Sequence, residues 1–471
     1  MRRERSIWGM IWCFSLPVLL CGCGGRLGRD VTEPLGGEEP AGPRLVASFL
    51  VRANPESRRM HFIPMAGRVY GEGELRPDIY LKNDPSDPPD WDGKNKILAG
   101  SVALHSNRPR ALYKVKILFK SSTLTGVEPS NPDGTTSAPY PMGYKYWDYG
   151  TVSGGSSRSA RWELSVPDET PFDFVVEVWA NEWREQAVST ANLYGIYAFD
   201  DKDIWVCGDS DTLLHTTDGG QSWTTYHTGQ TPTPDFRAIW FPTSTRGFTV
   251  CHQRIFWSYT YPSDWRPILG VSGNITYNDV HFADGDHGWV VGYNDDIDKG
   301  EIRITSNGGS VWGGAINPDA SYKKPLYGVW LLSSSSGWVV GGGGLILHSS
   351  NGGQNWSTQE SGTTSALYDV HMLDVNDGWA VGAGGTILHW NGSQWEDKSP
   401  PGVTATLRAV WFVSTKEGWV VGDGGTILHT EDGGSTWESQ ESPVSANLHG
   451  LFFLNEAQGW AVGEGGVFLK F

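Results

Sequence analysis

Side chains suited to molecular recognition recur at near-regular spacing in the C-terminal part of this sequence. Each is the second residue of a short apolar run, and the set is Tyr194, Arg237, Asn278, Tyr327, Tyr368, Arg408 and His449. Tyrosine buries a large area at low entropic cost, and arginine forms paired hydrogen bonds with carboxylates. We predict that these residues form one partner-binding ring. Side chains that only hydrate and cap a channel would show the same pattern.

Catalysis by these residues is the least favoured interpretation. A glycosidase of the sialidase type needs three arginines, a tyrosine nucleophile with a glutamate partner, and an aspartic acid. The same runs offer only Arg237 and Arg408, no glutamate, and aspartate at Asp279 and Asp369. We therefore expect no catalytic residue, no metal and no cofactor. Four histidines recur one per repeat and cannot converge on a metal, so we expect structural roles for His215, His348, His389 and His429.

The elements that must position this ring are repeats with a period of about 40 residues, which is typical of propeller blades. An aromatic residue marks the second strand of each unit, at Trp205, Phe248, Trp289, Trp338, Trp379, Trp419 and Trp460. These registers predict a seven-bladed β-propeller over residues 182–471. The innermost strands then carry the recognition residues to the mouth of a central channel.

The last repeat ends at Phe471, after its third strand. The segment that begins at Trp183 matches the fourth strands that begin at Trp356 and Trp437. We predict that Trp183 and its neighbours complete the last blade, so that the ring closes as three strands plus one. Such closure removes free sheet edges.

A turn between the third and fourth strands carries an Asp-box motif, in which Asp or Asn precedes two glycines and a tryptophan. The acidic or amide side chain accepts backbone N–H bonds, and glycine takes the positive-φ positions. We interpret the motif as structural and expect its tryptophan to pack between blades. The pairs are Asp218 and Trp223, Asn307 and Trp312, Asn351 and Trp356, and Asp432 and Trp437.

Residues 44–181 alternate apolar and polar side chains at period two, which predicts an antiparallel β-sandwich. The acidic segment from Asp84 to Asn95 has the composition of a calcium loop, but it lacks a recognisable ligand frame, and a solvated proline-rich loop is favoured. Residues 23–43 are rich in Gly, Glu and Pro and read as a flexible tether.

The N-terminus has the layout of a secretory signal over residues 1–22. Arg2, Arg3 and Arg5 precede an apolar run that is too short to span a bilayer as a mature helix. The run ends in Leu20-Cys21-Gly22-Cys23, which resembles the lipobox of bacterial lipoproteins and implies that Cys23 is acylated. We expect an exported, membrane-anchored lipoprotein, in the outer membrane or at the cell surface if the host is Gram-negative. An ordinary signal peptide or a retained N-terminal anchor would also export the chain.

Composition limits the class of partner. The formal charge is −17, which repels phosphate backbones and argues against nucleic acid. Only 19% of residues are charged, while 61 glycines and 24 tryptophans suit many short strands joined by tight turns. Two cysteines, Cys207 and Cys251, remain in the folded part. Equivalent strands of adjacent blades lie too far apart for a disulfide, so we expect two buried thiols.

The combined patterns L-Y-G-V-W, G-W-V-V-G, G-x-I-L-H-T and D-G-G-x-T-W resemble the photosystem II stability/assembly factor family of seven-bladed propellers. The resemblance covers Trp183 to Phe471 and implies a non-enzymatic, extracytoplasmic interaction module. Members of that family look like chaperones that bind a photosystem subunit through a basic patch, and Arg237 and Arg408 match arginines of that patch. The upstream domain and the acidic charge depart from the family, so a photosynthetic role does not follow from the resemblance.

The sequence therefore predicts a monomeric, lipid-anchored envelope protein whose propeller acts as a protein-binding or assembly scaffold. The partner is an envelope protein or a surface glycan, because tyrosine and tryptophan on β-scaffolds also stack on sugar rings. A carbohydrate-binding surface protein is thus the main alternative, and a sialidase-like enzyme is a distant third. Contact with the membrane is expected through the lipid anchor alone.

Overall fold

The computed structural model describes residues 183–258, 264–268, 273–313 and 323–471, together with the backbone of the strands between residues 44 and 181. The predicted signal, the tether and Cys23 lie outside the described residues, as do the side chains of the Asp84–Asn95 segment. In the part of the chain that the structure describes, no helix has the length and apolar character needed to cross a membrane.

The strands between residues 44 and 181 form two antiparallel sheets. The larger has the order β2 (Arg59–Pro64), β1 (Arg44–Asn54), β11 (Phe172–Asn181), β6 (Leu112–Ser122), β9 (Lys145–Val152) and β8 (Gly134–Thr135). The smaller has the order β3 (Ile79–Asn83), β5 (Ile97–Ser106), β10 (Ser157–Ser165) and β7 (Glu128–Pro129), with β4 (Asp90–Asp92) paired to β5. The region is all-β, as expected, and the packing of these sheets as a sandwich stays a prediction.

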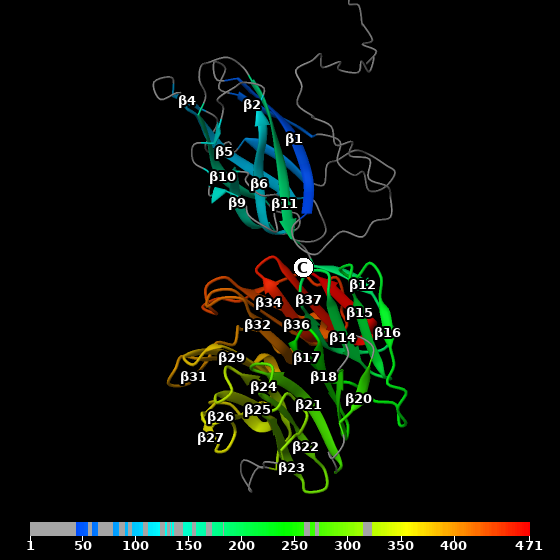
Figure 1. Cartoon of the computed structure of the whole chain (residues 1–471). Helices are drawn as coiled ribbons and strands as arrows, with labels where there is room; N and C mark the ends of the chain where they lie inside the picture. The colour runs from blue at the N-terminus through cyan, green and yellow to red at the C-terminus, as the bar shows by residue number, and fades with distance from the viewer. Residues whose placement is uncertain are drawn as a thin grey trace, which may run out of the picture. The chain divides into compact units, whose positions relative to one another are not determined.

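The rest of the chain forms the predicted seven-bladed propeller, coloured from green to red in Figure 1. Blades 1 to 3 comprise β13 (Leu193–Ala198) to β16 (Thr224–Tyr226), β17 (Ala238–Thr243) to β20 (Trp265–Pro267), and β21 (Ile275–Phe282) to β23 (Lys299–Thr305). Blades 4 to 6 comprise β24 (Leu326–Leu331) to β27 (Ser357–Gln359), β28 (Leu367–Asp374) to β31 (Trp395–Asp397), and β32 (Leu407–Phe412) to β35 (Glu438–Ser439). Blade 7 comprises β36 (Leu448–Asn455), β37 (Gln458–Gly463), β38 (Val467–Lys470) and β12 (Arg184–Ala187).

The innermost strands form a closed circle of contacts, since each packs against the innermost strands of both neighbouring blades, from β13 through β36 and back to β13. Behind them, the second strands are almost entirely buried, and in four blades the tryptophan of this strand stacks on the histidine of the third strand. Trp419 and His429 are an example, with ring centroids 4.5 Å apart. The Nε2 atom of His429 lies 2.8 Å from a carboxylate oxygen of Glu417, which orients the ring. The recurrent histidines thus hold the tryptophans of the blades.

The Asp-box turn of blade 6 shows how these turns join neighbouring blades. Asp432 accepts the backbone N–H of Thr436 at 2.8 Å, and this bond holds the pKa of the carboxyl below its usual range. Gly434 has a φ of +70°, and a Cβ atom there would lie 2.1 Å from the Trp379 ring of blade 5. Trp437 lies edge-on to the same Trp379 ring, at 5.7 Å between centroids. The turn therefore packs against the preceding blade.

The other Asp-box tryptophans also lie against rings of an adjacent blade. Trp223 contacts Phe468 at 5.1 Å, and Trp356 contacts Trp289 at 4.9 Å. Trp312 lies within 6.0 Å of Phe248.

Closure of the ring uses the predicted segment. β12 pairs antiparallel with β38, with Arg184 opposite Lys470. Trp183 is buried beside Phe471, and its Nε1 atom donates a hydrogen bond to Gln440 Oε1 of blade 6 at 2.7 Å. In the same way, Trp395 on the fourth strand of blade 5 donates to Gln359 Oε1 of blade 4 at 2.9 Å. Trp183 therefore occupies the fourth-strand position of blade 7.

The two cysteines of the propeller, Cys207 and Cys251, are free and buried thiols. Burial raises the pKa of each thiol to about 12, so neither forms a thiolate at neutral pH.

We predict that Trp183→Ala lowers the free energy of unfolding of the propeller by about 3–5 kcal/mol, because it leaves a cavity at the closure. Trp183→Phe fills most of that space but leaves Gln440 without its donor, so it should cost less, about 1–3 kcal/mol. Urea denaturation followed by circular dichroism measures both. Val375→Ala, at an exposed turn position, is the control. If Trp183→Ala is as stable as that control, β12 does not hold the ring closed.

Candidate functional site

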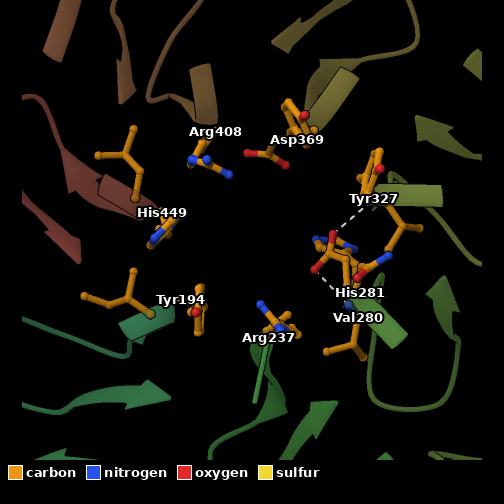
Figure 2. Close-up of a pocket in the computed structure, with 18 of the residues that line it drawn as sticks. Tyr194, Arg237, Val280, His281, Tyr327, Asp369, Arg408 and His449 are labelled. Atoms are coloured by element: carbon orange, nitrogen blue, oxygen red, sulfur yellow. Dashed lines mark hydrogen bonds between the residues drawn. The ribbon is translucent and has the colours of Figure 1, made fainter. Parts of the chain in front are cut away.

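The predicted recognition residues come together in the structure. All seven line one pocket of about 230 Å³ at the mouth of the propeller channel. Figure 2 shows Tyr194, Arg237, Tyr327, Arg408 and His449 around this opening. Because each comes from a different blade, the pocket exists only when the ring is assembled.

A β-bulge in the innermost strands aims these side chains. Strand pairing shifts across the rim residue in six blades, for example between Leu326 and Gly328 on either side of Tyr327. A bulged residue leaves the ladder, and its side chain is directed away from the pleat. In blade 2, Arg237 precedes β17 and its backbone N–H donates to Val250 O at 2.9 Å.

The residue after each rim residue faces the next blade at close range. In five blades it is Gly195, Ala238, Gly328, Ala409 or Gly450. A Cβ atom on Gly328 would lie 2.9 Å from the Cα atom of Asp369, so little space is left between these strands. Blades 3 and 5 instead carry aspartate. Asp279 accepts the N–H of Val280 at 2.8 Å and that of Val329, in blade 4, at 2.9 Å.

Asp369 makes the equivalent pair of bonds. It accepts the N–H groups of Val370 at 2.8 Å and of Val410, in blade 6, at 2.9 Å. Each carboxylate thus connects its own strand to the next blade.

An aromatic belt lies beneath this layer and consists of the residues three positions after the rim residues. Its members are Tyr197, Trp240, His281, Trp330, His371, Trp411 and Phe452. Neighbouring ring centroids lie 4.1 to 5.2 Å apart around the full circle. Four belt residues, Trp240, His281, Trp330 and Trp411, line the pocket and form its base.

The two arginines at the rim differ in how far their charge is compensated. Arg408 donates from its guanidinium to both carboxylate oxygens of Asp423, at 3.2 Å for the Nη2 bond. Arg237 lies 4.7 Å above the centre of the Tyr194 ring and is exposed. It has no ion pair with any carboxylate that the structure describes. Arg237 is therefore the rim arginine whose charge is available to an anionic group.

Two carboxyls and two imidazoles near the base have shifted pKa values. Burial raises the pKa of Asp279 to about 6, while burial and repulsion by Asp279 raise that of Asp369 to about 7. Burial lowers the pKa of His281 and of His371 to about 3, so both rings are neutral at pH 7. Leu331 N–H donates to His281 Nδ1 at 3.2 Å, which places the ring proton on Nε2.

Sequence reasoning considered Asp279 and Asp369 only as catalytic acids and did not single out His281 or His371. A signal was present, because Asp-Val-His occurs in blades 3 and 5, where the other blades carry a small residue and a large aromatic.

Comparison with known proteins places this geometry in a family. The model of the family described as photosynthesis system II assembly factor YCF48 matches residues 160–260, 258–360, 355–442 and 394–471, which together span more than half of the chain. The chain belongs to this family.

Individual relatives match over shorter spans or at lower identity. The photosystem II assembly lipoprotein Ycf48 of Synechococcus sp. (strain CC9902) is 38% identical over 84 residues, which are 17% of this chain and 22% of that protein. The chain thus matches about a fifth of the length of that curated relative.

Solved structures share the propeller. A structure of YCF48 bound to D1 peptide is 20% identical, with a TM-score of 0.52, and the match covers 62% of this chain and 95% of that one. YCF48 from Cyanidioschyzon merolae is 19% identical, with a TM-score of 0.50, and covers 62% and 98%. The RRP9 WD40 repeats reach a TM-score of 0.52 at 9% identity, covering 61% and 97%. At these identities the likeness shows the fold alone.

We predict that the buried carboxyls make stability depend on pH. Their folded-state pKa values, about 6 and about 7, exceed the value of about 3.9 in an unfolded chain. The folded state therefore binds more protons between these values, and stability falls as pH rises through this window. Relative to Asp279→Asn/Asp369→Asn, the natural protein should gain thermal stability as pH falls from about 8 to about 5. A melting-temperature difference that is constant over this range would contradict the raised pKa values.

Proposed function

We propose that this protein is a non-enzymatic assembly factor that binds a segment of a partner protein in the pocket at the propeller mouth. The convergence of the rim residues from separate blades carries the proposal. The family to which the chain belongs supports an assembly role. The related YCF48 that has been solved with D1 peptide makes a polypeptide the ligand class to test.

The chemistry of the rim also supports binding of a polypeptide. Arg237 offers an uncompensated guanidinium, which can pair with a carboxylate of a side chain or a chain end. Tyr327 and Tyr368 lie with ring centroids 5.0 Å apart and give a wide, rigid contact surface beside it. A sialidase-type reaction lacks support for two reasons. Arg408 is ion-paired with Asp423, and no glutamate is among the residues that line the pocket.

We further propose that the mature protein is held at a membrane by acylated Cys23, with residues 23–43 as the tether. The word lipoprotein in the name of the Synechococcus relative supports this arrangement. A lipid anchor would keep the propeller near membrane partners while leaving it free to turn.

Arg237→Glu should strongly weaken capture of the partner. A photo-crosslinking amino acid at Tyr327 in the native membrane should give one discrete protein adduct, and Arg237→Glu should reduce its yield at least about tenfold, since the change replaces an attractive pair by a repulsive one. Arg266→Glu is the matched control, because Arg266 is an exposed arginine of blade 2 outside the pocket. Equal adduct yields in the two variants would rule out the rim as the binding site, and a glycan-only adduct would favour the carbohydrate alternative.

Cys23→Ala should release the protein from the membrane fraction, because no acyl chain can be attached without the thiol. Cell fractionation with immunoblotting measures this, and Cys21→Ala, two residues earlier, should leave anchoring intact. If Cys23→Ala stays with the membrane, the N-terminal segment is retained as the anchor instead.

A further inference from the structure

The Asp-Val-His sequence of blades 3 and 5 places unusual polar groups at and beside the base of the pocket. In blade 3 these are Asp279 and His281, and in blade 5 they are Asp369 and His371. Asp279, Asp369 and His281 all line the pocket, as Figure 2 shows for His281 and Asp369. The two motifs flank blade 4, whose innermost strand carries Gly328 at the equivalent layer.

The fold does not require these aspartates. Five blades carry glycine or alanine at the same position and still pack their innermost strands into the closed circle. The bonds from Asp279 and Asp369 to the next blade are therefore additional to blade packing. Burying a carboxylate is costly unless a cation accompanies it. Both aspartates are partly buried, and neither has an ion pair among the described residues.

The neighbouring imidazoles do not supply the missing positive charge, because both are neutral at pH 7. They also carry atoms without partners in the described structure. His281 Nε2 is buried and has no acceptor, and His371 Nδ1 is buried and has no partner. The N–H of Leu331 donates to Nδ1 of His281, so the ring proton is on Nε2. The ring itself lines the pocket. The layer around the base of the pocket thus contains buried hydrogen-bonding atoms that the described residues leave without partners.

A metal ion does not account for this set. Among the described residues, three metal-ligating groups approach within 4.8 Å of one another at Glu417, His429 and Glu431, and this cluster lies outside the pocket. The aspartates and histidines of the base do not meet that criterion.

We infer that the base of the pocket, between Asp279 and Asp369, takes the side chain of a lysine or arginine from the bound partner segment. This inference rests on the proposed function, because it names the chemistry of the segment that the pocket binds. An ammonium or guanidinium donates to both carboxylates, and the Tyr327 ring above them favours a cation. The Tyr368 ring already has the guanidinium of Arg408 over it, 5.8 Å from its centroid. A pocket of about 230 Å³ holds one such side chain. The pocket then binds an acidic group of the partner at Arg237 and a basic group at its base.

The test is selection of random heptapeptides displayed on phage, carried out with the mature protein and two variants. Peptides selected by the natural protein should share a lysine or arginine at one position. Asp279→Ala/Asp369→Ala should lose that preference and keep the other shared residues. Alanine is the residue that blades 2 and 6 carry at this layer, so the variant is expected to fold, and its melting temperature and circular dichroism check this. Arg237→Glu should lose an acidic preference instead.

One selected peptide is then made with norleucine in place of the shared lysine, which removes the charge and keeps the chain length. The natural protein should bind this peptide at least about tenfold more weakly, since a hydrogen bond to a charged group contributes about 1.5–3 kcal/mol. The double alanine variant should bind both peptides alike. A glutamine version that binds as tightly as lysine would show that the base takes a neutral amide.

The outcomes separate the two proposals. Selected peptides that lack a shared basic residue, or that keep it with the double alanine variant, would overturn the inference about the base and leave the proposed function standing. Failure to select any peptide, or a selection unchanged by Arg237→Glu, would overturn the proposed function and the inference with it.

Discussion

The antiparallel pairing of β12 with β38 is the contact on which the propeller depends. It joins residues from opposite ends of the domain, with Arg184 opposite Lys470, and so turns a linear array of blades into a circle. Trp183 reinforces it by packing on Phe471 and bonding Gln440. Because the rim of the pocket takes one residue from each blade, separation at this contact would spread the rim as well as expose sheet edges.

Within the circle, one position of each innermost strand serves packing between blades, and the position before it serves recognition. The residue after the rim residue is small in most blades, which lets adjacent innermost strands approach closely, as at Gly328. In six blades the rim residue lies in a bulge, so its side chain is directed out of the ladder and toward the channel mouth. The same backbone can therefore present tyrosine, arginine, asparagine or histidine at the rim without a change of fold.

Much of this arrangement could be predicted from the sequence, because it follows from repetition. The spacing of the second-strand aromatics gave the number of blades, and the match between the segments at Trp183 and Trp437 gave the closure. The equivalence of repeats also identified the rim, since equivalent residues of a circular array face the same axis.

What could not be predicted depends on contacts between residues that no repeat relates. The neutralisation of Arg408 by Asp423 requires the position of a turn between β33 (Gly418–Gly422) and β34 (Ile427–Thr430). The environment of Asp279 and Asp369 requires the depth of the pocket, because sequence inspection treats a buried and an exposed carboxylate alike. The side-chain packing of the N-terminal sheets has no repeat to guide it, and there the sequence predicts strands but not their order.

The bulge at the rim residue lets proteins of this fold diversify in what they bind. Because each rim residue belongs to a separate blade and lies outside the strand ladder, a single codon change can alter the ligand while the backbone pairing of the blades stays intact. Duplicated genes could therefore acquire new binding partners one blade at a time, without passing through unfolded intermediates.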